Sequence, residues 1–181
     1  MLWSDAGADA DITQPCLQLC VGQTRQLVAD VNDRLYSARA KRPPPLRDEK
    51  ILASSNGLMI SAYARAALVL GDMSYAAEAA RCADVLLTKM RNDGRLLHSL
   101  KGGQTGSDGF LDDYAFTIAG LLDVYEATGE LRWLREALAL DEVLESHFED
   151  KQNGGFYLTG DAHEALLTRE KPSYDGAEPS G

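Results

Sequence analysis

The chain has 181 residues, 45% of them hydrophobic, and its 28 acidic residues outnumber 18 basic ones, giving a formal net charge of −10. Length and composition favour one globular domain and argue against wholesale disorder. The acidic balance disfavours nucleic acid as a partner, and no apolar run reaches the roughly 20 residues that span a bilayer. Three cysteines fit no disulfide framework and the N-terminus lacks a secretory signal pattern, so we expect a cytoplasmic protein.

The first 18 residues are small and acidic and show no sustained hydrophobic period, which predicts a flexible leader over residues 1–18. From Leu19 a helical period begins, with Leu27, Val31 and Leu35 four residues apart. The helix must end before residues 43–45, because three consecutive prolines lack the N–H groups that a helix needs. One helix is therefore predicted between the leader and this proline run.

Two pairs of helices follow, each broken by a glycine and each followed by a glycine-containing turn. The first pair should begin near Ser54 or Ser55, which are good N-cap residues, break at Gly71 and end near Met90. The second pair covers residues 110–128 and 131–148, and short extended segments are predicted at 95–100 and 156–158. Apolar stripes are predicted at Met59, Ala62, Ala66 and Leu70; at Tyr75, Ala79, Ala83, Leu86 and Met90; and at Trp133, Ala137, Leu140, Leu144 and Phe148.

The two pairs of helices form an internal repeat at an offset of 58 residues. This offset aligns Gly71 with Gly129, Tyr75 with Trp133, Ala79 with Ala137, Leu86 with Leu144 and Met90 with Phe148. Such hairpins bury their apolar faces only by stacking on one another. We therefore predict an all-α fold, a partial (α/α)6 toroid of helical hairpins, with about five helices in an incomplete domain over residues 19–181. In the tail, Pro179 and Ser180 are placed as if to open a further helix.

Several short motifs match a known family. They are residues 48–52 (DEKIL), 56–60 (NGLMI), 109–116 (GFLDDYAF), 120–123 (GLLD), 125–129 (YEATG) and 175–180 (DGAEPS). In their order and spacing, they make the chain from Leu19 to Gly181 resemble the spermatogenesis-associated protein 20/YyaL family. The resemblance implies a thioredoxin-like domain, absent from this chain, followed by an α/α toroid similar to those of N-acylglucosamine 2-epimerases and six-hairpin glycosidases. The family usually has tryptophan before the Asn-Gly pair, where this chain has Ser55.

Asp112 and Asp113 are the leading catalytic candidates, because they stand where a glycine-rich loop enters a helix. A carboxylate in such a place can act as general acid or base when burial and neighbouring charge set its pKa. Adjacent helical residues point about 100° apart, so these two cannot face one substrate as a pair. Their structural alternative is a place in the helix's first turn, where negative charge favours the helix dipole.

His98 is the third catalytic candidate, because it lies on a predicted loop strand and histidine is the natural base near neutral pH. Asn56 and Tyr114 are predicted to bind substrate, as are Asp175 and Glu178 in the tail. Two of these have a structural alternative. Asn56 can instead cap its helix, and Tyr114 can instead belong to the core.

No metal motif, phosphate-binding loop or cofactor signature is present. No second histidine accompanies His98, since His147 ends a helix and His163 lies in the polar tail, which argues against epimerisation by this segment. Whether the protein is an enzyme stays open. The intact toroid either binds or processes a small saccharide in its cavity, or serves as a non-catalytic scaffold that partners a thioredoxin-like domain or another protein through exposed hairpin faces. A truncated product without independent activity is the remaining alternative.

Overall fold

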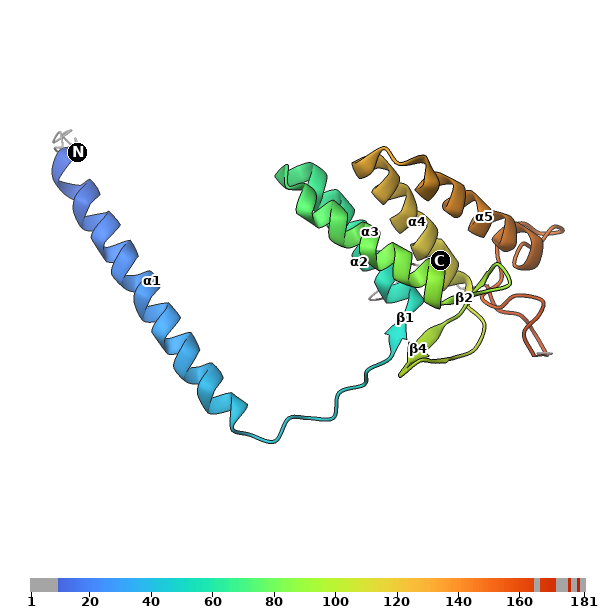
Figure 1. The fold of residues 1–181 in the computed structure, drawn as a ribbon, viewed down its shortest axis with the longest axis horizontal. Coiled ribbons are helices and arrows are strands. Elements are labelled where there is room, and N and C mark those ends of the chain that lie inside the picture. The colour runs from blue at the N-terminus through green and yellow to red at the C-terminus, as the bar shows by residue number, and fades with distance from the viewer. Residues whose placement is uncertain (1–9, 165–166, 172–175, 177–178, 180–181) are drawn as a thin grey trace, which may run out of the picture. The chain divides into compact units, whose positions relative to one another are not determined.

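The computed structural model describes residues 10–164, 167–171, 176 and 179, and the chain divides into two units, Met1–Asp48 and Glu49–Gly181. The described residues form five α-helices and five strands of two or three residues each (Figure 1). The helical class predicted from the sequence is therefore confirmed. None of the helices described has both the length and the apolar character needed to cross a membrane.

The first unit consists of α1 (Ala10–Ala40) and the irregular segment 41–48. The helix ends before the proline run, as predicted. It begins at Ala10, however, and not at Leu19, so the described part of the predicted leader is helical. The prediction relied on the missing hydrophobic period, and a helix can form without one. Residues 1–9 lie outside the described part of the chain.

The second unit is built from two helical hairpins, α2–α3 and α4–α5. The helices are α2 (Ala53–Leu70), α3 (Met73–Lys89), α4 (Leu111–Thr128) and α5 (Leu131–His147), within about a residue or two of their predicted bounds. Gly71 (φ 68°) and Gly129 (φ 71°) end α2 and α4 in the left-handed conformation, which glycine adopts without steric cost. The two breaks aligned by the sequence repeat are thus the same structural feature.

Short strands lie beside the helix ends. β1 (Ile51–Leu52), β4 (Ser99–Lys101) and β5 (Gln104–Thr105) form an antiparallel sheet in the order β1–β4–β5. β2 (Arg91–Asn92) and β3 (Arg95–Leu96) form a hairpin. The predicted segment 95–100 is split between β3 and β4, because the N–H groups of Leu97 and His98 donate to Met90 and Ser107 outside both ladders. The predicted segment 156–158 forms one bridge, Glu149 with Phe156.

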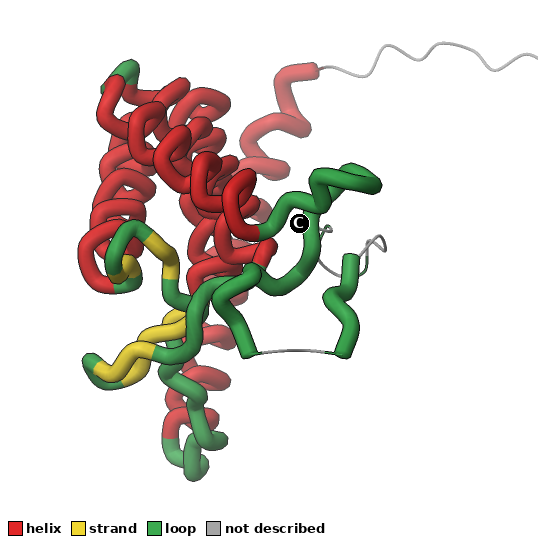
Figure 2. The backbone as a smooth tube through the Cα atoms, turned by 90° about the vertical axis from the view of Figure 1, so that its right-hand side faces the viewer, coloured by secondary structure: helices red, strands yellow, loops and turns green. Residues whose placement is uncertain are grey.

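α2 and α4 run parallel and in close contact. Figure 2 shows the strands, in yellow, at one end of the helices of the second unit. Glycines make the close approach of α2 and α4 achievable. A Cβ at Gly57 would lie 2.5 Å from the carbonyl carbon of Phe116, and one at Gly120 would lie 2.8 Å from the carbonyl oxygen of Gly57. The hydrophobic core is formed with α3 and α5, and its largest fully buried side chains include Trp133, Tyr114, Ile60, Leu86, Met90, Leu96, Leu121 and Leu140. Burying each large apolar side chain contributes about 1.5–3 kcal/mol.

The predicted stripes of α3 and α5 face this core. Ala79, Ala83, Leu86 and Met90 are buried, as are Trp133, Ala137, Leu140, Leu144 and Phe148, while Tyr75 is half-buried. The predicted stripe of α2 is wrong, because Met59 and Leu70 are 53% and 64% exposed. The side of α2 that packs consists of Ala53, Gly57, Ile60, Ala64 and Ala67. α2 is apolar on both sides, so its period alone cannot select the buried one.

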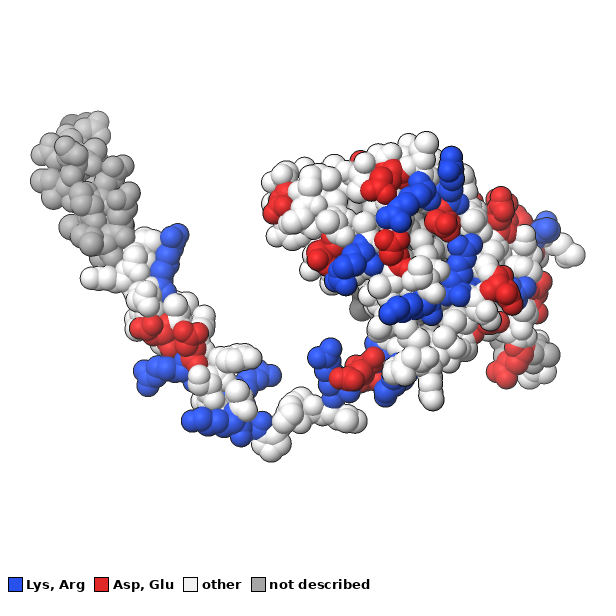
Figure 3. Space-filling view, in the orientation of Figure 1, with Lys and Arg blue, Asp and Glu red and all other residues white. Residues whose placement is uncertain are grey.

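Basic and acidic side chains are interspersed over the face of the second unit shown in Figure 3. Some of them form ion pairs between the two hairpins. Arg132 Nη1 of α5 lies 3.0 Å from Asp84 Oδ1 of α3, and Arg91 Nη1 lies 2.6 Å from Glu136 Oε2. Exposed ion pairs of this kind contribute at most about 1 kcal/mol, so the hairpins are held together mainly by apolar burial.

Candidate active site

The N-terminal ends of α2 and α4 lie at the same end of the second unit, because the two helices are parallel. The loops that follow α3 and α5 gather there. The backbone N–H of Ala53 donates to the carbonyl of His98 (3.0 Å), and that of Leu111 donates to Leu158 (2.9 Å). Helix N-termini carry partial positive charge, so this end can hold negatively charged groups.

Asp113 connects the two helix N-termini. Its Oδ2 accepts hydrogen bonds from the backbone N–H of Phe110 (2.8 Å) and from His98 Nδ1 (2.9 Å), and its Oδ1 accepts one from the N–H of Ser54 (2.9 Å). It therefore satisfies N–H groups at the starts of both α4 and α2. Neither Ser54 nor Ser55 caps α2, contrary to the prediction, because Asp113 of the neighbouring hairpin takes that role. The Asp113 side chain is only 1% exposed, so it can influence a bound ligand only through its hydrogen bond to His98.

His98 is held by both its backbone and its ring. Its N–H donates to the carbonyl of Ser107 (2.9 Å), and its Nδ1 lies 2.9 Å from Asp113 Oδ2. A carboxylate accepts, so Nδ1 carries the proton and Nε2 keeps its lone pair in the neutral ring. The side chain is 34% exposed and no described residue bonds Nε2. This is the arrangement of a base whose orientation is fixed by a buried acid.

Asp112 and Asn56 stand beside this pair at the same helix ends. Asp112 is half-buried in the first turn of α4, next to Asp113 but on another side of the helix. Asn56 is half-buried in the first turn of α2, and its Nδ2 donates to the carbonyl of Leu52 (2.7 Å). That bond leaves its amide oxygen as an acceptor.

Tyr114 belongs to the core. Its side chain is 2% exposed, its hydroxyl accepts a hydrogen bond from the N–H of Leu96 (2.9 Å), and its ring packs on Phe148 with centroids 5.2 Å apart. Burial raises the pKa of the hydroxyl. In this position the ring is not open for stacking on a sugar. The structure thus brings His98 and Asp113 together, with Asp112 and Asn56 at the same helix ends. Tyr114 is buried in the core. Asp175 and Glu178 lie outside the described residues.

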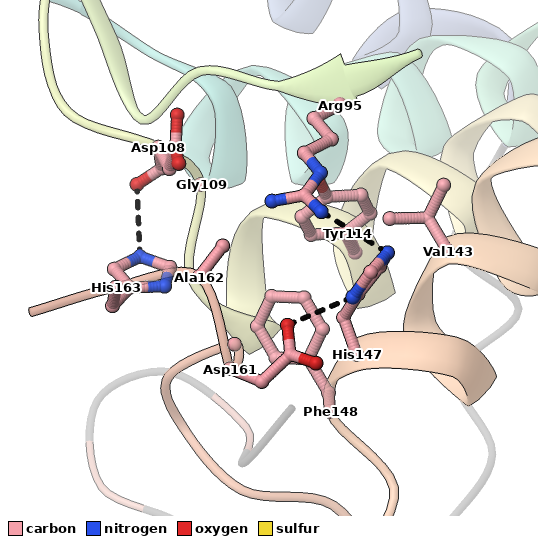
Figure 4. A pocket seen from close by; sticks show the side chains of 11 residues that line it. Arg95, Asp108, Gly109, Tyr114, Val143, His147, Phe148, Asp161, Ala162 and His163 are labelled. Atoms are coloured by element: carbon pink, nitrogen blue, oxygen red, sulfur yellow. Dashed lines mark hydrogen bonds and ion pairs between the residues drawn. The ribbon is translucent and has the colours of Figure 1, made fainter. Parts of the chain in front are cut away.

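His147, expected only to end a helix, belongs to a hydrogen-bond network in the structure (Figure 4). Arg95 Nη2 donates to His147 Nε2 (3.2 Å), because a guanidinium has no acceptor, and His147 Nδ1 therefore donates to Asp161 Oδ1 (2.8 Å). These side chains line a cavity of about 10 Å³, room for one water molecule. Both ring nitrogens of His147 are engaged, which makes it a structural residue.

His163 lies close to the His98–Asp113 pair although 65 residues separate it from His98 in sequence. Both histidine rings contact Phe110, His98 edge-on at 5.1 Å between centroids and His163 at 5.3 Å. His163 Nε2 faces the carbonyl oxygen of Asp108 (3.4 Å), and its buried Nδ1 has no hydrogen-bond partner among the described residues. The absence of a second histidine near His98, inferred from the sequence, is thus corrected: the chain folds back after α5 and brings one to Phe110.

Asp150 stabilises the loop after α5 that brings His163 to Phe110. Its buried carboxylate accepts hydrogen bonds from Lys171 Nζ (2.5 Å) and the Tyr157 hydroxyl (2.9 Å), and from the N–H groups of Gln152 and Asn153. The hydrogen bond from Lys171, followed by those from Asn153 and Tyr157, holds the pKa of Asp150 far below its usual range. The loop carrying His163 is therefore anchored at its base. In the described part of the chain, no three His, Cys, Asp or Glu side chains are grouped to hold a metal ion.

Comparison with known proteins identifies the segment. No protein-family model matches the chain. Spermatogenesis-associated protein 20 of Homo sapiens is 37% identical over 182 residues, which cover 94% of this chain and 23% of that protein. The Rattus norvegicus protein of the same name is 37% identical over 171 residues, covering 88% and 22%. Over this segment the chain is homologous to part of spermatogenesis-associated protein 20. It spans less than a quarter of the length of these relatives.

Solved structures show the fold. A sugar epimerase from a ruminal bacterium superposes with a TM-score of 0.55 at 19% identity, over 63% of this chain and 31% of that one. Cellobiose 2-epimerase from Spirochaeta thermophila gives 0.55 at 18% identity, over 60% and 28%. At such identities the likeness concerns the fold alone. The segment homologous to spermatogenesis-associated protein 20 is therefore part of an α/α toroid, as predicted from its helical repeat.

Proposed function

We propose that the intact toroid of this spermatogenesis-associated protein 20 relative binds a saccharide at the N-terminal ends of α2 and α4, and that His98 transfers a proton to or from it. The observation that carries the proposal is the hydrogen bond from His98 Nδ1 to Asp113, which is 1% exposed and fixed by the N–H groups of Ser54 and Phe110. The toroid fold shared with two sugar epimerases supports the choice of ligand by analogy.

The chemistry follows from the two nitrogens of His98. Nε2 bonds no described residue and the side chain is 34% exposed, so its lone pair can remove a proton from a bound hydroxyl or from a carbon next to a carbonyl. The ring becomes positively charged when it does so, and the Asp113 carboxylate 2.9 Å away stabilises that charge. Asp113 is therefore a positioning residue, and His98 is the group that touches the substrate. Asn56 and Asp112 supply hydrogen bonds to sugar hydroxyls from the same helix ends.

Of the two histidines that contact Phe110, only His98 is paired with a buried carboxylate, so the reactions open to one base come first. One base can remove a proton and return it on the same face of the sugar, as isomerisation between an aldose and a ketose requires. Epimerisation at carbon needs a proton delivered to the opposite face by a second group, or an intermediate that flips so that its other face meets the same base. His98 acting alone supports isomerisation or hydroxyl activation, whereas epimerisation would need a second group, for which His163 beside Phe110 is the candidate.

Saccharide binding and turnover by the full-length protein test this proposal over a panel of free sugars. His98→Gln should retain binding and lower turnover by about 100-fold or more, because the proton-transfer group is lost. His147→Gln is the matched control, since its ring nitrogens bond Arg95 and Asp161 instead of facing solvent. Equal turnover by wild type and His98→Gln, or no binding to any sugar, would contradict the proposal.

The uncovered side of α2 favours a second function, a helical scaffold. Met59, Leu68, Val69 and Leu70 are all more than half exposed on one helix, and apolar patches of this kind mark interaction sites. The resemblance to the family suggests a thioredoxin-like domain as the partner. Titrating a separately expressed thioredoxin-like domain of the family into the protein tests this. Binding that is lost in Met59→Asp and Leu70→Asp supports a scaffold, and no binding at high concentration argues against this partner.

A further inference from the structure

A groove of about 520 Å³ borders the His98–Asp113 pair, a volume in the range of small-molecule pockets. Phe110 lines the groove and touches His98 edge-on, with ring centroids 5.1 Å apart. Ser107 also lines it, and its carbonyl oxygen accepts the N–H of His98 (2.9 Å). The groove thus begins next to the candidate proton-transfer group.

The groove's lining is polar with one aromatic ring. It contains hydroxyls from Ser107 and Thr159, carboxylates from Asp108 and Glu164, the imidazole of His163 and the ring of Phe110. Hydroxyls and carboxylates pair with the many O–H donors of a sugar, and an aromatic ring packs on its C–H groups. The buried Nδ1 of His163 has no hydrogen-bond partner among the described residues, and such an atom calls for a water or a ligand hydroxyl.

The charge of the groove is negative. No lysine or arginine is among its described lining residues, and neither Asp108 nor Glu164 forms an ion pair with a described residue. Two nearby arginines are engaged elsewhere. Arg169 bonds the carbonyl oxygens of Thr159 and His147 and packs on the ring of Tyr157, and Arg95, in the adjoining cavity, donates to His147. Two uncompensated carboxylates repel a ligand phosphate or carboxylate and attract an ammonium group.

From this lining we infer that the groove is the saccharide subsite of the proposed function, on which this inference rests, and that it takes uncharged or amino-bearing sugars and rejects sugar acids and sugar phosphates. Selection follows from Asp108 and Glu164, whose side chains are exposed and act through partly screened charge. The expected discrimination is therefore moderate, about 3- to 10-fold for each change of one unit of ligand charge.

Calorimetric titration of the full-length protein with glucose, glucosamine and glucuronate tests the inference, at a pH where the amino sugar is protonated. Glucosamine should bind about 3- to 10-fold more tightly than glucose, and glucuronate more weakly by a similar factor. The differences should shrink in ~0.5 M salt, where charges beyond a few ångströms are screened.

The double variant Asp108→Asn/Glu164→Gln should bring the three affinities to within about twofold of one another. Glu142→Gln/Glu145→Gln is the matched control, because it removes the same charge from α5 outside the groove lining, and it should keep the order of affinities. Glucuronate binding as tightly as glucose, or an order unchanged in the groove variant, would overturn this inference while leaving saccharide binding intact. Failure of all three sugars to bind would overturn the proposed function together with it.

Discussion

The two hairpins of the second unit share one plan but begin differently. α4 has its own acidic first turn, in which Asp113 bonds the N–H of Phe110. α2 has no side-chain cap of its own and receives Asp113 across the contact, at the N–H of Ser54. α2 is also covered by α4 on one side and open on the other. The comparison teaches that one hairpin of this toroid supplies a helix cap to the next, since Asp113 of the second hairpin caps α2 of the first. The candidate site lies at this contact between the two helix starts.

The largest expected effect on stability comes from a substitution that forces α2 and α4 apart. Gly57→Val should destabilise the protein by more than about 3 kcal/mol, because the new side chain meets the backbone of Phe116, which cannot move aside. Ala62→Val, on the exposed side of α2, should cost less than about 1 kcal/mol. Urea unfolding of both variants measures the difference. Similar costs for both would show that the tight contact between α2 and α4 is absent in solution.

The two sides of α2 can be compared through one large side chain each. Ile60→Ala removes a side chain that is 1% exposed and should cost about 2–5 kcal/mol, through lost burial and the cavity left behind. Met59→Ala, at a residue 53% exposed, should cost less than about 1 kcal/mol. Thermal unfolding of each variant provides the measurement. A cost at Met59 that equals the cost at Ile60 would mean that a further element covers the open side.

Removing the shared cap should loosen both hairpins at once. Asp113→Asn weakens charge-assisted hydrogen bonds at two helix starts and should cost about 2 kcal/mol. Hydrogen exchange should accelerate in the first turns of both α2 and α4. Asp84→Asn, which removes an exposed ion pair with Arg132, should leave both turns protected. Loss of protection in α4 alone would contradict the shared cap.

The smallest effect is expected from the pH dependence of the stability that Asp150 contributes. Its hydrogen bonds hold the loop after α5 that brings His163 to Phe110. The pKa of Asp150 is lower in the folded protein than the ~3.9 of an unfolded chain, so its contribution to stability is present above about pH 4 and is lost as the pH falls. Asp150→Asn should therefore be less stable than wild type at neutral pH, with a gap that narrows in acid. Unfolding curves from neutral pH to about pH 3 test this. A gap independent of pH would exclude a specific role for the carboxylate.

The helices of the second unit could be predicted because their signals are local. Gly71 and Gly129 end two of them, and the stripes that contain Leu86 and Leu144 are narrow and amphipathic. The buried side of α2 could not be predicted, because its two sides are equally apolar and only the neighbouring helix selects one. The early start of α1 escaped prediction because residues 10–18 show no hydrophobic period, and a helix can form without one.

Some residues of the candidate site, His98 and Asp113 among them, could be nominated from the sequence, but their arrangement could not. The position of Asp113 in a helix's first turn followed from the sequence. Its bond to His98 depends on backbone hydrogen bonds that tie His98 to Ala53 and Ser107, and such long-range pairings leave no local pattern. The approach of His163 depends in the same way on the chain returning after α5. Polar side chains at loop ends can thus be nominated from sequence, whereas their partners cannot.

The hydrogen bond between His98 and Asp113 can be measured directly through the tautomer of the imidazole. Long-range proton–nitrogen NMR spectra of His98 near neutral pH distinguish a protonated Nδ1 from a protonated Nε2. A carboxylate acceptor at Nδ1 requires the proton on that nitrogen and a lone pair on Nε2, and this preference should be lost in Asp113→Asn. A ring that carries its proton on Nε2 in the wild type would contradict the account, because Nε2 could then not accept a proton from a ligand.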